Sequence, residues 1–127
     1  MYNLGKLDKS KYKCITKDIV TDEVIITKER LGHIQERHPE DYEKYLDYLK
    51  DCVFDPDYII EGNKPRTAVA LKNINIDGKN AKAIVRLITS NDNTSFKNSI
   101  ITFQTIRDKE WNRLINNKPV LYKKAVT

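Results

Sequence analysis

Residues 66–89, RTAVALKNINIDGKNAKAIVRLIT, predict the central hairpin of the fold. Each half alternates apolar with polar side chains and is rich in β-branched residues, a pattern typical of a strand with one face in a core. Between the halves, DGKN supplies Asp77 and Gly78, a residue pair favoured by two-residue hairpin turns. The stretch therefore predicts two antiparallel strands, over about residues 66–74 and 81–89.

Two helices are predicted before this hairpin. Thr27 is a suitable N-cap for a helix that runs to about Arg37, because its hydroxyl can accept a bond from a free N–H of the first turn. Pro39 ends that helix by pushing the preceding residue out of the helical conformation, and it then opens the second helix. The second helix carries an apolar stripe at helical spacing, which predicts its core-facing side: Tyr42, Tyr45, Leu46, Leu49 and Val53.

Further strands and a closing helix surround the hairpin. DEVIIT (22–27) and SIITFQTI (99–106) are β-branched runs that predict strands, and RDKEWNRLI (107–115) predicts a helix. The tail after this helix is expected to be peripheral. Helices first and an antiparallel meander second predict an α+β fold, with the N-terminal helices packed on one face of an antiparallel sheet and a short C-terminal helix. The closing helix should turn three side chains inward: Trp111, Leu114 and Ile115.

Composition limits the classes of function. The 127 residues predict a single domain over 1–127, with 39% hydrophobic and 32% charged residues. No stretch approaches the roughly twenty apolar residues of a membrane span, and the N-terminus lacks a signal peptide's apolar core, so a cytoplasmic protein, or one delivered into a host cytoplasm, is expected. The net charge of +5 favours a polyanionic partner such as RNA or DNA. Two histidines and two separated cysteines predict no zinc site.

Strand register predicts a basic surface on one face of the sheet. Arg66 and Lys72, with small alanines between them, share one face of the first hairpin strand. The same open face is expected to carry Arg86 from the second strand, and Thr102 and Gln104 from the last. Such a surface suits a phosphate. Residues of the other parity are expected to take the core: Val69, Leu71, Val85, Leu87, Ile101 and Phe103.

Both histidines lie in GHIQERHPED, residues 32–41. His38 follows Ile34 by one helical turn, so it should point to the apolar side at the end of the helix, whereas His33 shares a side with Arg37. A histidine in such a position is either a packed, hydrogen-bonded residue or an acid–base catalyst. Beside a cationic surface, an imidazole could serve RNA transesterification, in which the ribose 2′-hydroxyl is the nucleophile.

The order of these motifs resembles the phage members of the barnase–EndoU–colicin–RelE (BECR) superfamily of metal-independent ribonucleases. The resemblance covers about residues 24–106. It is carried by the helix that ends in RHPE, by FDPDYII, by the strand RTAVALKN and by the late strand NSIITFQ.

The resemblance implies an α+β fold, RNA cleavage to a 2′,3′-cyclic phosphate, and no metal or other cofactor. Carried over to this chain, His38 is the acid–base group, Arg66 and Lys72 bind the phosphate, and Thr102 supplies a hydroxyl contact. RNA, with tRNA among the candidates, is the expected substrate, and an acidic inhibitor is a candidate partner. Substrate-binding roles are expected for the remaining candidates: His33, Arg86, Ser99 and Gln104.

Two non-enzymatic alternatives stay open. One is a basic sheet that binds nucleic acid or an acidic protein without cutting, and the other is a phage-encoded inhibitor of a host nucleic-acid machine. The first would favour stacking aromatic side chains on the open face, but the tyrosines fall mainly in a helix stripe. A metal-dependent nuclease is disfavoured, since Glu36 and Asp41 flank His38 at helix ends rather than in a strand.

Overall fold

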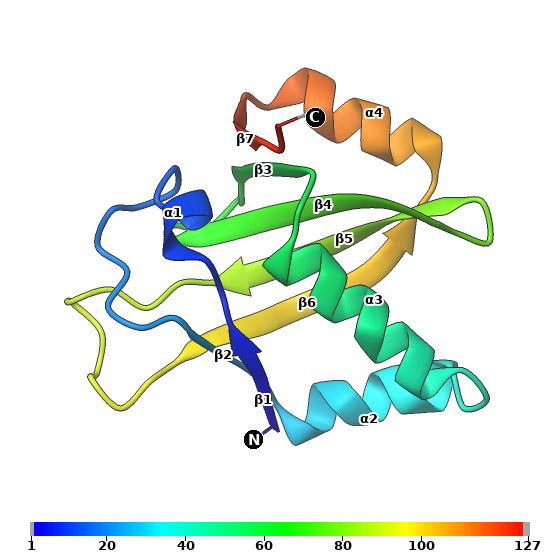
Figure 1. Ribbon diagram of the computed structural model, residues 1–127, viewed down its shortest axis with the longest axis horizontal. Helices are drawn as coiled ribbons and strands as arrows, with labels where there is room; N and C mark the ends of the chain where they lie inside the picture. The colour runs from blue at the N-terminus through cyan, green and yellow to red at the C-terminus, as the bar shows by residue number, and fades with distance from the viewer. Residues whose placement is uncertain (1, 126–127) are drawn as a thin grey trace.

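The computed structural model describes residues 2–125 of the chain, and within these residues it has four helices and one seven-stranded sheet (Figure 1). This α+β architecture agrees with the predicted class. The elements in chain order are β1 (Tyr2–Lys6), α1 (Lys9–Tyr12), β2 (Glu23–Ile26), α2 (Lys28–Arg37), α3 (Tyr42–Phe54), β3 (Tyr58–Glu61), β4 (Thr67–Ile76), β5 (Lys79–Arg86), β6 (Asn98–Ile106), α4 (Asp108–Asn117) and β7 (Val120–Lys123).

The strands are ordered β1-β2-β6-β5-β4-β3-β7, and every neighbouring pair is antiparallel except β2 and β6. β2 pairs with β6 only at Asn98 and Ser99. Asn98 is fully buried there, and its amide binds the backbone of Thr21 and Ile88, which fixes the start of β6. Beyond Ser99, the described residues place no strand along this edge of β6, and α2 lies beside it (Figure 1).

The predicted hairpin is confirmed as β4 and β5. Asp77 and Gly78 both have positive φ, 50° and 76°, as a two-residue type I′ turn requires. The strand partners separate after Arg86, so β5 ends three residues earlier than the sequence indicates. The tail expected to be peripheral adds β7, an edge strand beside β3 whose residues are largely exposed.

The two predicted N-terminal helices form, with one boundary changed. Thr27 caps α2 and accepts a hydrogen bond from the Arg30 N–H, as predicted. α3 begins at Tyr42 instead of Pro39, because residues 39–41 form a turn. Proline forces His38 out of the helical conformation, and the chain then needs this turn to reverse toward the sheet.

The larger core lies under α3, on the face of the sheet that carries Ala68 and Ala70. Both alanines are fully buried among the apolar side chains of α3, so the prediction that they line an open trough is wrong. Small side chains on β4 and β5 let the helix approach the sheet closely, and the helix stripe fills the space between them. The buried stripe matches the predicted one: Tyr45, Leu46, Leu49 and Val53, with Tyr42 partly buried.

The opposite face of the sheet carries a smaller core under α4. Val69 and Leu71 are buried, as expected, but they pack with Ile60 and Ile106 against α4 rather than against the N-terminal helices. Helices therefore cover both faces of the sheet, whereas the sequence predicted one covered face and one open face. Three side chains of α4 point inward as predicted: Trp111, Leu114 and Ile115.

Two glycines provide a test of this packing. A Cβ at Gly62 would lie 2.8 Å from Thr67 Cγ2 and 2.9 Å from the Thr67 carbonyl oxygen, whereas nothing lies within 4 Å of a Cβ at Gly32 in α2. We expect Gly62→Ala to destabilise the fold by about 1–3 kcal/mol, and Gly32→Ala to stabilise it by about 0.5–1 kcal/mol. Urea denaturation measures both; shifts of the same sign in the two variants would contradict the structure.

Candidate active site

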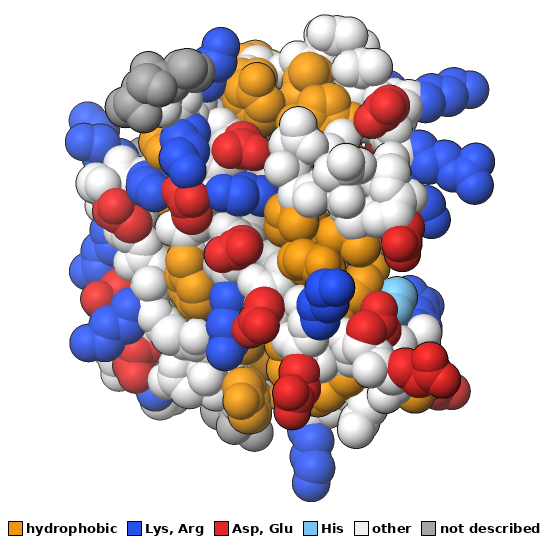
Figure 2. All heavy atoms as spheres, turned by 45° about the vertical axis from the view of Figure 1, so that its right-hand side comes forward, with side chains coloured by type: hydrophobic (Ala, Val, Ile, Leu, Met, Phe, Trp, Pro, Cys, Tyr) orange, Lys and Arg blue, Asp and Glu red, His pale blue; other side chains and the backbone are white. Residues whose placement is uncertain are grey.

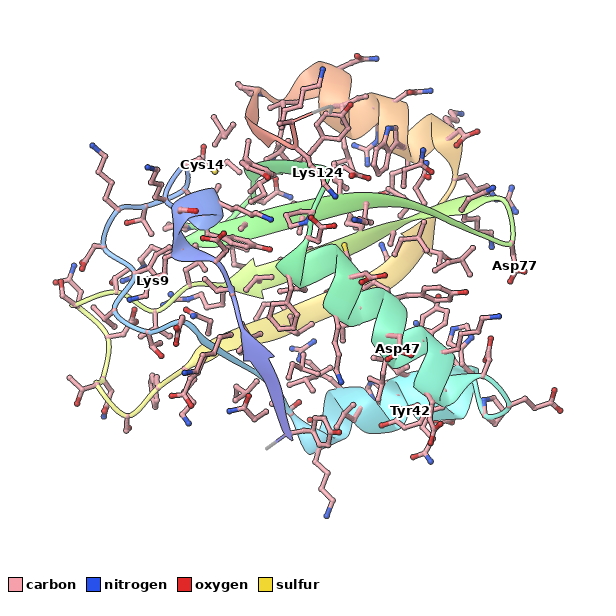
Figure 3. All side chains as sticks on the ribbon, in the orientation of Figure 1. Lys9, Cys14, Tyr42, Asp47, Asp77 and Lys124 are labelled. Atoms are coloured by element: carbon pink, nitrogen blue, oxygen red, sulfur yellow. The ribbon has the colours of Figure 1, made fainter. Side chains whose placement is uncertain are left out.

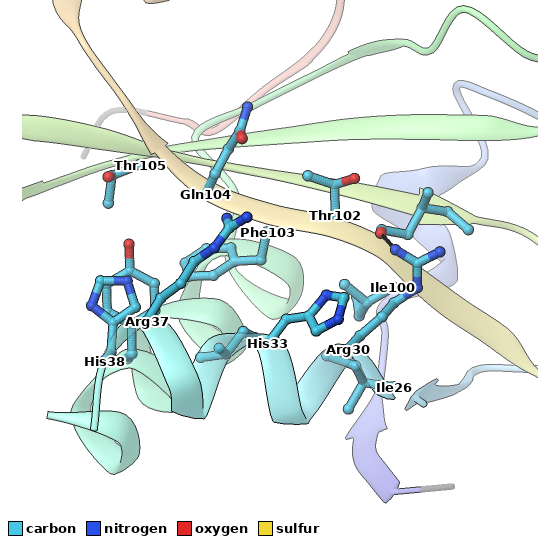
Figure 4. A pocket seen from close by; sticks show the side chains of 13 residues that line it. Ile26, Arg30, His33, Arg37, His38, Ile100, Thr102, Phe103, Gln104 and Thr105 are labelled. Carbon is cyan, nitrogen blue, oxygen red and sulfur yellow. Dashed lines mark hydrogen bonds between the residues drawn. The ribbon is translucent and has the colours of Figure 1, made fainter. Parts of the chain in front are cut away.

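A hollow of about 510 Å³ lies between α2 and the edge of β6 that no described strand covers. Figure 4 shows Arg30, His33 and Arg37 projecting from α2 toward β6, with His38 at the end of the helix. Both histidines of the chain therefore line one hollow, although the sequence placed them on different sides of the helix.

The cationic side of this hollow is one face of α2. Arg30, His33 and Arg37 follow one another at spacings of three and four residues, so they project from the same side of the helix. Ile34 lies next to them in sequence but is buried in the core, which fixes the rotation of the helix. The Arg30 guanidinium donates a hydrogen bond to the Ile101 carbonyl oxygen of β6 and ties α2 to this edge (Figure 4).

His38 is held on two sides. Its ring stacks on Tyr45 of α3, with 3.7 Å between ring centroids and 17° between planes. Its Nδ1 lies 3.7 Å from Asp41 Oδ1, an ion-pair distance that is longer than a hydrogen bond. Tyr45 in turn packs edge-on against Phe103 of β6, with the ring centroids 5.4 Å apart. The side chain keeps 30% exposure, so the ring is oriented and still accessible.

The ionisable side chains that line this hollow are mainly basic. Among the described residues that line it there are two arginines and both histidines, and no aspartate or glutamate. The surface nearby is different: Figure 2 shows a histidine beside basic side chains, with acidic side chains gathered close by. An anion is therefore favoured inside the hollow rather than over this whole face.

Of the three β6 residues predicted to contact the substrate, two line the hollow and one does not. Thr102 and Gln104 line the hollow. They lie on the far side of the strand from Phe103, because they pair in register with Ile84 and Lys82 on the α4 side (Figure 4). Ser99 does not line the hollow; it lies where β6 is paired with β2.

Lys72 is not in this hollow. Its Nζ lies 2.8 Å from the Asp55 carboxylate and 2.7 Å from the Asp55 carbonyl oxygen, at the end of α3. Lys11 and Lys124 also approach this carboxylate, at 3.6 Å and 2.7 Å (Figure 3 labels Lys124). The bonds from Lys124 and Lys72 hold the pKa of Asp55 well below its usual range. Lys72 thus joins β4 to α3 and the C-terminal tail.

Arg66 and Arg86 lie at the other end of β4 and β5, around Asp92. Arg86 makes an ion pair with Asp92 at 3.0 Å, and Arg66 lies 3.7 Å from the same carboxylate. The pKa of Asp92 is lowered mainly by the hydrogen bond from the Thr89 N–H and, to a smaller extent, by Arg86. Lys72 faces α3 and Arg86 faces the α4 side, because Lys72 pairs with Ala81 and Arg86 with Thr67. The predicted single trough, which needed all three cations on one face, does not form.

Three residues that line the hollow, Arg30, Tyr45 and Thr105, were not predicted from the sequence, and Arg37 was predicted only as a neighbour of His33. The spacing of Arg30, His33 and Arg37 was a usable signal for the cationic face of α2. The contact of Tyr45 with His38 could not be predicted, because a tyrosine in an apolar helix stripe indicates a core residue.

The comparison with protein families gives a match over nearly the whole chain. Residues 3–123 match the model of the family described as phage-Barnase-EndoU-ColicinE5/D-RelE like nuclease2. The chain belongs to this family. The match to this phage BECR-like nuclease family extends past residues 24–106 on both sides and takes in most of β1 and all of β7. Its description gives nuclease activity as the general class of function.

No curated protein and no solved structure matches the chain. Among residues 2–125, no group of three or more His, Cys, Asp or Glu side chains could hold a metal ion. No helix within the same range has the length and apolar character needed to cross a membrane.

The lysines around Asp55 predict an acid-sensitive stability. The folded state lowers the pKa of Asp55, so its ion pairs stabilise the fold at pH values above the unfolded-state pKa of about 3.9. This stabilisation is lost as the pH falls toward the pKa of the folded state. Asp55→Asn should cost about 0.5–1 kcal/mol at pH 7, given the partly exposed carboxylate. The difference from wild type should shrink below about pH 4.

Denaturation at pH 7 and pH 2.5 measures this effect. Asp47→Asn, at an exposed position of the same helix (Figure 3), is the matched control and should show no such dependence. A loss for Asp55→Asn that is equal at both pH values would contradict the role of the carboxylate charge.

Proposed function

We propose that this chain is an endoribonuclease that cleaves RNA without a metal ion, by attack of the ribose 2′-hydroxyl on the adjacent phosphate. The observation that carries the proposal is the hollow between α2 and β6, which holds both histidines and two arginines in a chain of a nuclease family. Such side chains supply proton transfer and charge stabilisation, the two requirements of this reaction.

The reaction forms an O2′–P bond and breaks the P–O5′ bond. A base removes the proton from the 2′-hydroxyl, and an acid protonates the departing 5′-oxygen, giving a 2′,3′-cyclic phosphate and a free 5′-hydroxyl. We assign acid–base work to His38, since the Tyr45 stack orients its ring, Asp41 lies near its Nδ1, and the side chain stays partly exposed to a substrate. His33 lines the same hollow and is the candidate for the second proton transfer.

Arg30 and Arg37 are the proposed phosphate ligands. Guanidinium groups present several N–H donors in a plane, which suits two oxygens of one phosphate, and their charge stabilises the doubly negative transition state. Thr102 and Gln104 add a hydroxyl and an amide at the rim of the hollow. This proposal assigns phosphate binding to α2 instead of to Arg66 and Lys72. Arg66 is engaged with Asp92, and Lys72 is engaged with Asp55.

Incubation with total RNA tests the reaction class. We expect cleavage to continue in excess EDTA and the fragments to carry 2′,3′-cyclic phosphate and 5′-hydroxyl ends, because the proposed acid–base and phosphate-binding groups are all side chains. Fragments with these ends resist ligation. They become substrates for ligation only after phosphatase and kinase treatment, which identifies the ends. Cleavage that EDTA abolishes and magnesium restores would reject the mechanism, and RNA binding without cleavage would favour a non-catalytic module.

Two variants of His38 separate catalysis from packing. His38→Phe keeps an aromatic ring over Tyr45 but removes the ring nitrogens, so it should lower kcat/KM at least about a hundredfold, with little change in melting temperature. His38→Ala should lose the same activity and also about 0.5–1.5 kcal/mol of the stacking contribution to stability.

Gln35→Ala, at an exposed position of α2 outside the hollow, is the control and should keep wild-type activity. If His38→Phe cuts RNA at the wild-type rate, His38 is a packing residue and the proposed role is wrong.

A further inference from the structure

A second hollow, of about 550 Å³, lies on the α4 side of the sheet. We call it the α4 groove. Its floor is apolar, and its walls come from the loop before β4, from β5 and from α4. Among the described residues that line it there is no aspartate or glutamate. It is lined by five cationic side chains: Lys64, Lys82, Arg86, Arg113 and Lys118.

The positive charge of the α4 groove is only partly neutralised by its surroundings. Glu110 is the carboxylate partner of both Lys82 and Arg113, at 3.2 Å and 3.5 Å, so one acid meets two cations. Lys118 donates to neutral oxygens, of Glu61 and Asn63, which leave its charge in place. Lys64 is exposed and has no ion pair among the described residues, whereas Arg86 is paired with Asp92 at 3.0 Å. A net positive potential remains along the groove.

The α4 groove adjoins the candidate active site. Ile101 lines both hollows. Thr102 and Gln104, which line the first, pair in register with Ile84 and Lys82, which line the second. A bulge between Ile84 and Val85 in this pairing gives β6 an extra residue at this point, Ile101 itself. A ligand bound at α2 would therefore reach the α4 groove by crossing the edge of β6 near Ile101.

We propose that the α4 groove binds the single-stranded RNA that continues to one side of the cleaved phosphate. The cations would meet backbone phosphates, and the apolar floor, which includes Val69, Ile84 and Leu114, would meet base faces. The assignment of the cleaved phosphate rests on the proposed function, but binding in the groove can be measured without cleavage. Continuity with the active-site hollow favours RNA over an acidic protein, which has no need to reach α2.

The test uses RNA of two lengths and two pairs of substitutions. The groove pair is Lys64→Gln with Arg113→Gln, both at exposed positions. The control pair is Lys13→Gln with Lys44→Gln, which changes the net charge equally at exposed positions outside both hollows. The probes are a non-cleavable 2′-O-methyl RNA 12-mer for binding, and a dinucleotide and an RNA 12-mer as substrates.

The groove pair should weaken binding of the 12-mer and reduce the slope of log K against log salt by about 1.4, for two lost contacts to a single strand. Its kcat/KM should fall several times more for the RNA 12-mer than for the dinucleotide, whereas the control pair should change neither ratio nor slope. Equal effects of the two pairs on the 12-mer would overturn the groove assignment, even if wild type cuts RNA as proposed.

The remaining outcomes separate the two proposals. If wild type binds the 12-mer through the groove but cuts nothing, the groove assignment stands and the cleavage proposal fails. If wild type binds no RNA, both fail. If the groove pair leaves RNA affinity at the control level but loses affinity for polyglutamate, the groove is a surface for an acidic protein and the RNA assignment is overturned.

Discussion

The short pairing of β2 with β6 is the constraint on which the candidate site depends. β2 covers only Asn98 and Ser99, so the carbonyl groups farther along β6 need another partner. α2 lies along that edge, and the Arg30 guanidinium binds the Ile101 carbonyl oxygen. The same helix face then holds His33 and Arg37 over the strand. A longer β2 would satisfy the edge and leave no room for the hollow.

The position of His38 depends on how α3 packs against the sheet. Alanines on β4 and β5 let α3 lie close to the sheet, and this places Tyr45 between Phe103 and the end of α2. Pro39 ends α2 at His38, where the imidazole meets the tyrosine ring. Core packing and the orientation of a candidate catalytic group are thus one arrangement, which explains why a tyrosine in an apolar stripe also shapes the site.

The distribution of charge gives the two hollows a common character. Lysines and arginines that are bound to carboxylates, such as Lys72 on Asp55, join elements of the fold and leave little charge for a ligand. Among the described residues, Arg30 and Arg37 of α2 have no carboxylate partner, two carboxylates serve three of the five cations of the α4 groove, and no acidic side chain lines either hollow. A modest net charge of +5 can therefore produce a locally strong preference for anions. Nuclease family membership and this local charge support the same kind of ligand.

The sequence by itself determined the local structure: the hairpin turn at Asp77 and Gly78, the N-cap at Thr27, the helix end before Pro39 and the apolar stripe of α3. These features follow from short-range preferences of backbone and side chain, and the motif order also indicated the family. Only the tertiary structure decided which sheet face each helix covers, because alternation gives two faces without saying which is packed by what. It therefore separated Lys72 from Arg86 and brought both histidines to the edge of β6, through contacts between residues far apart in the chain.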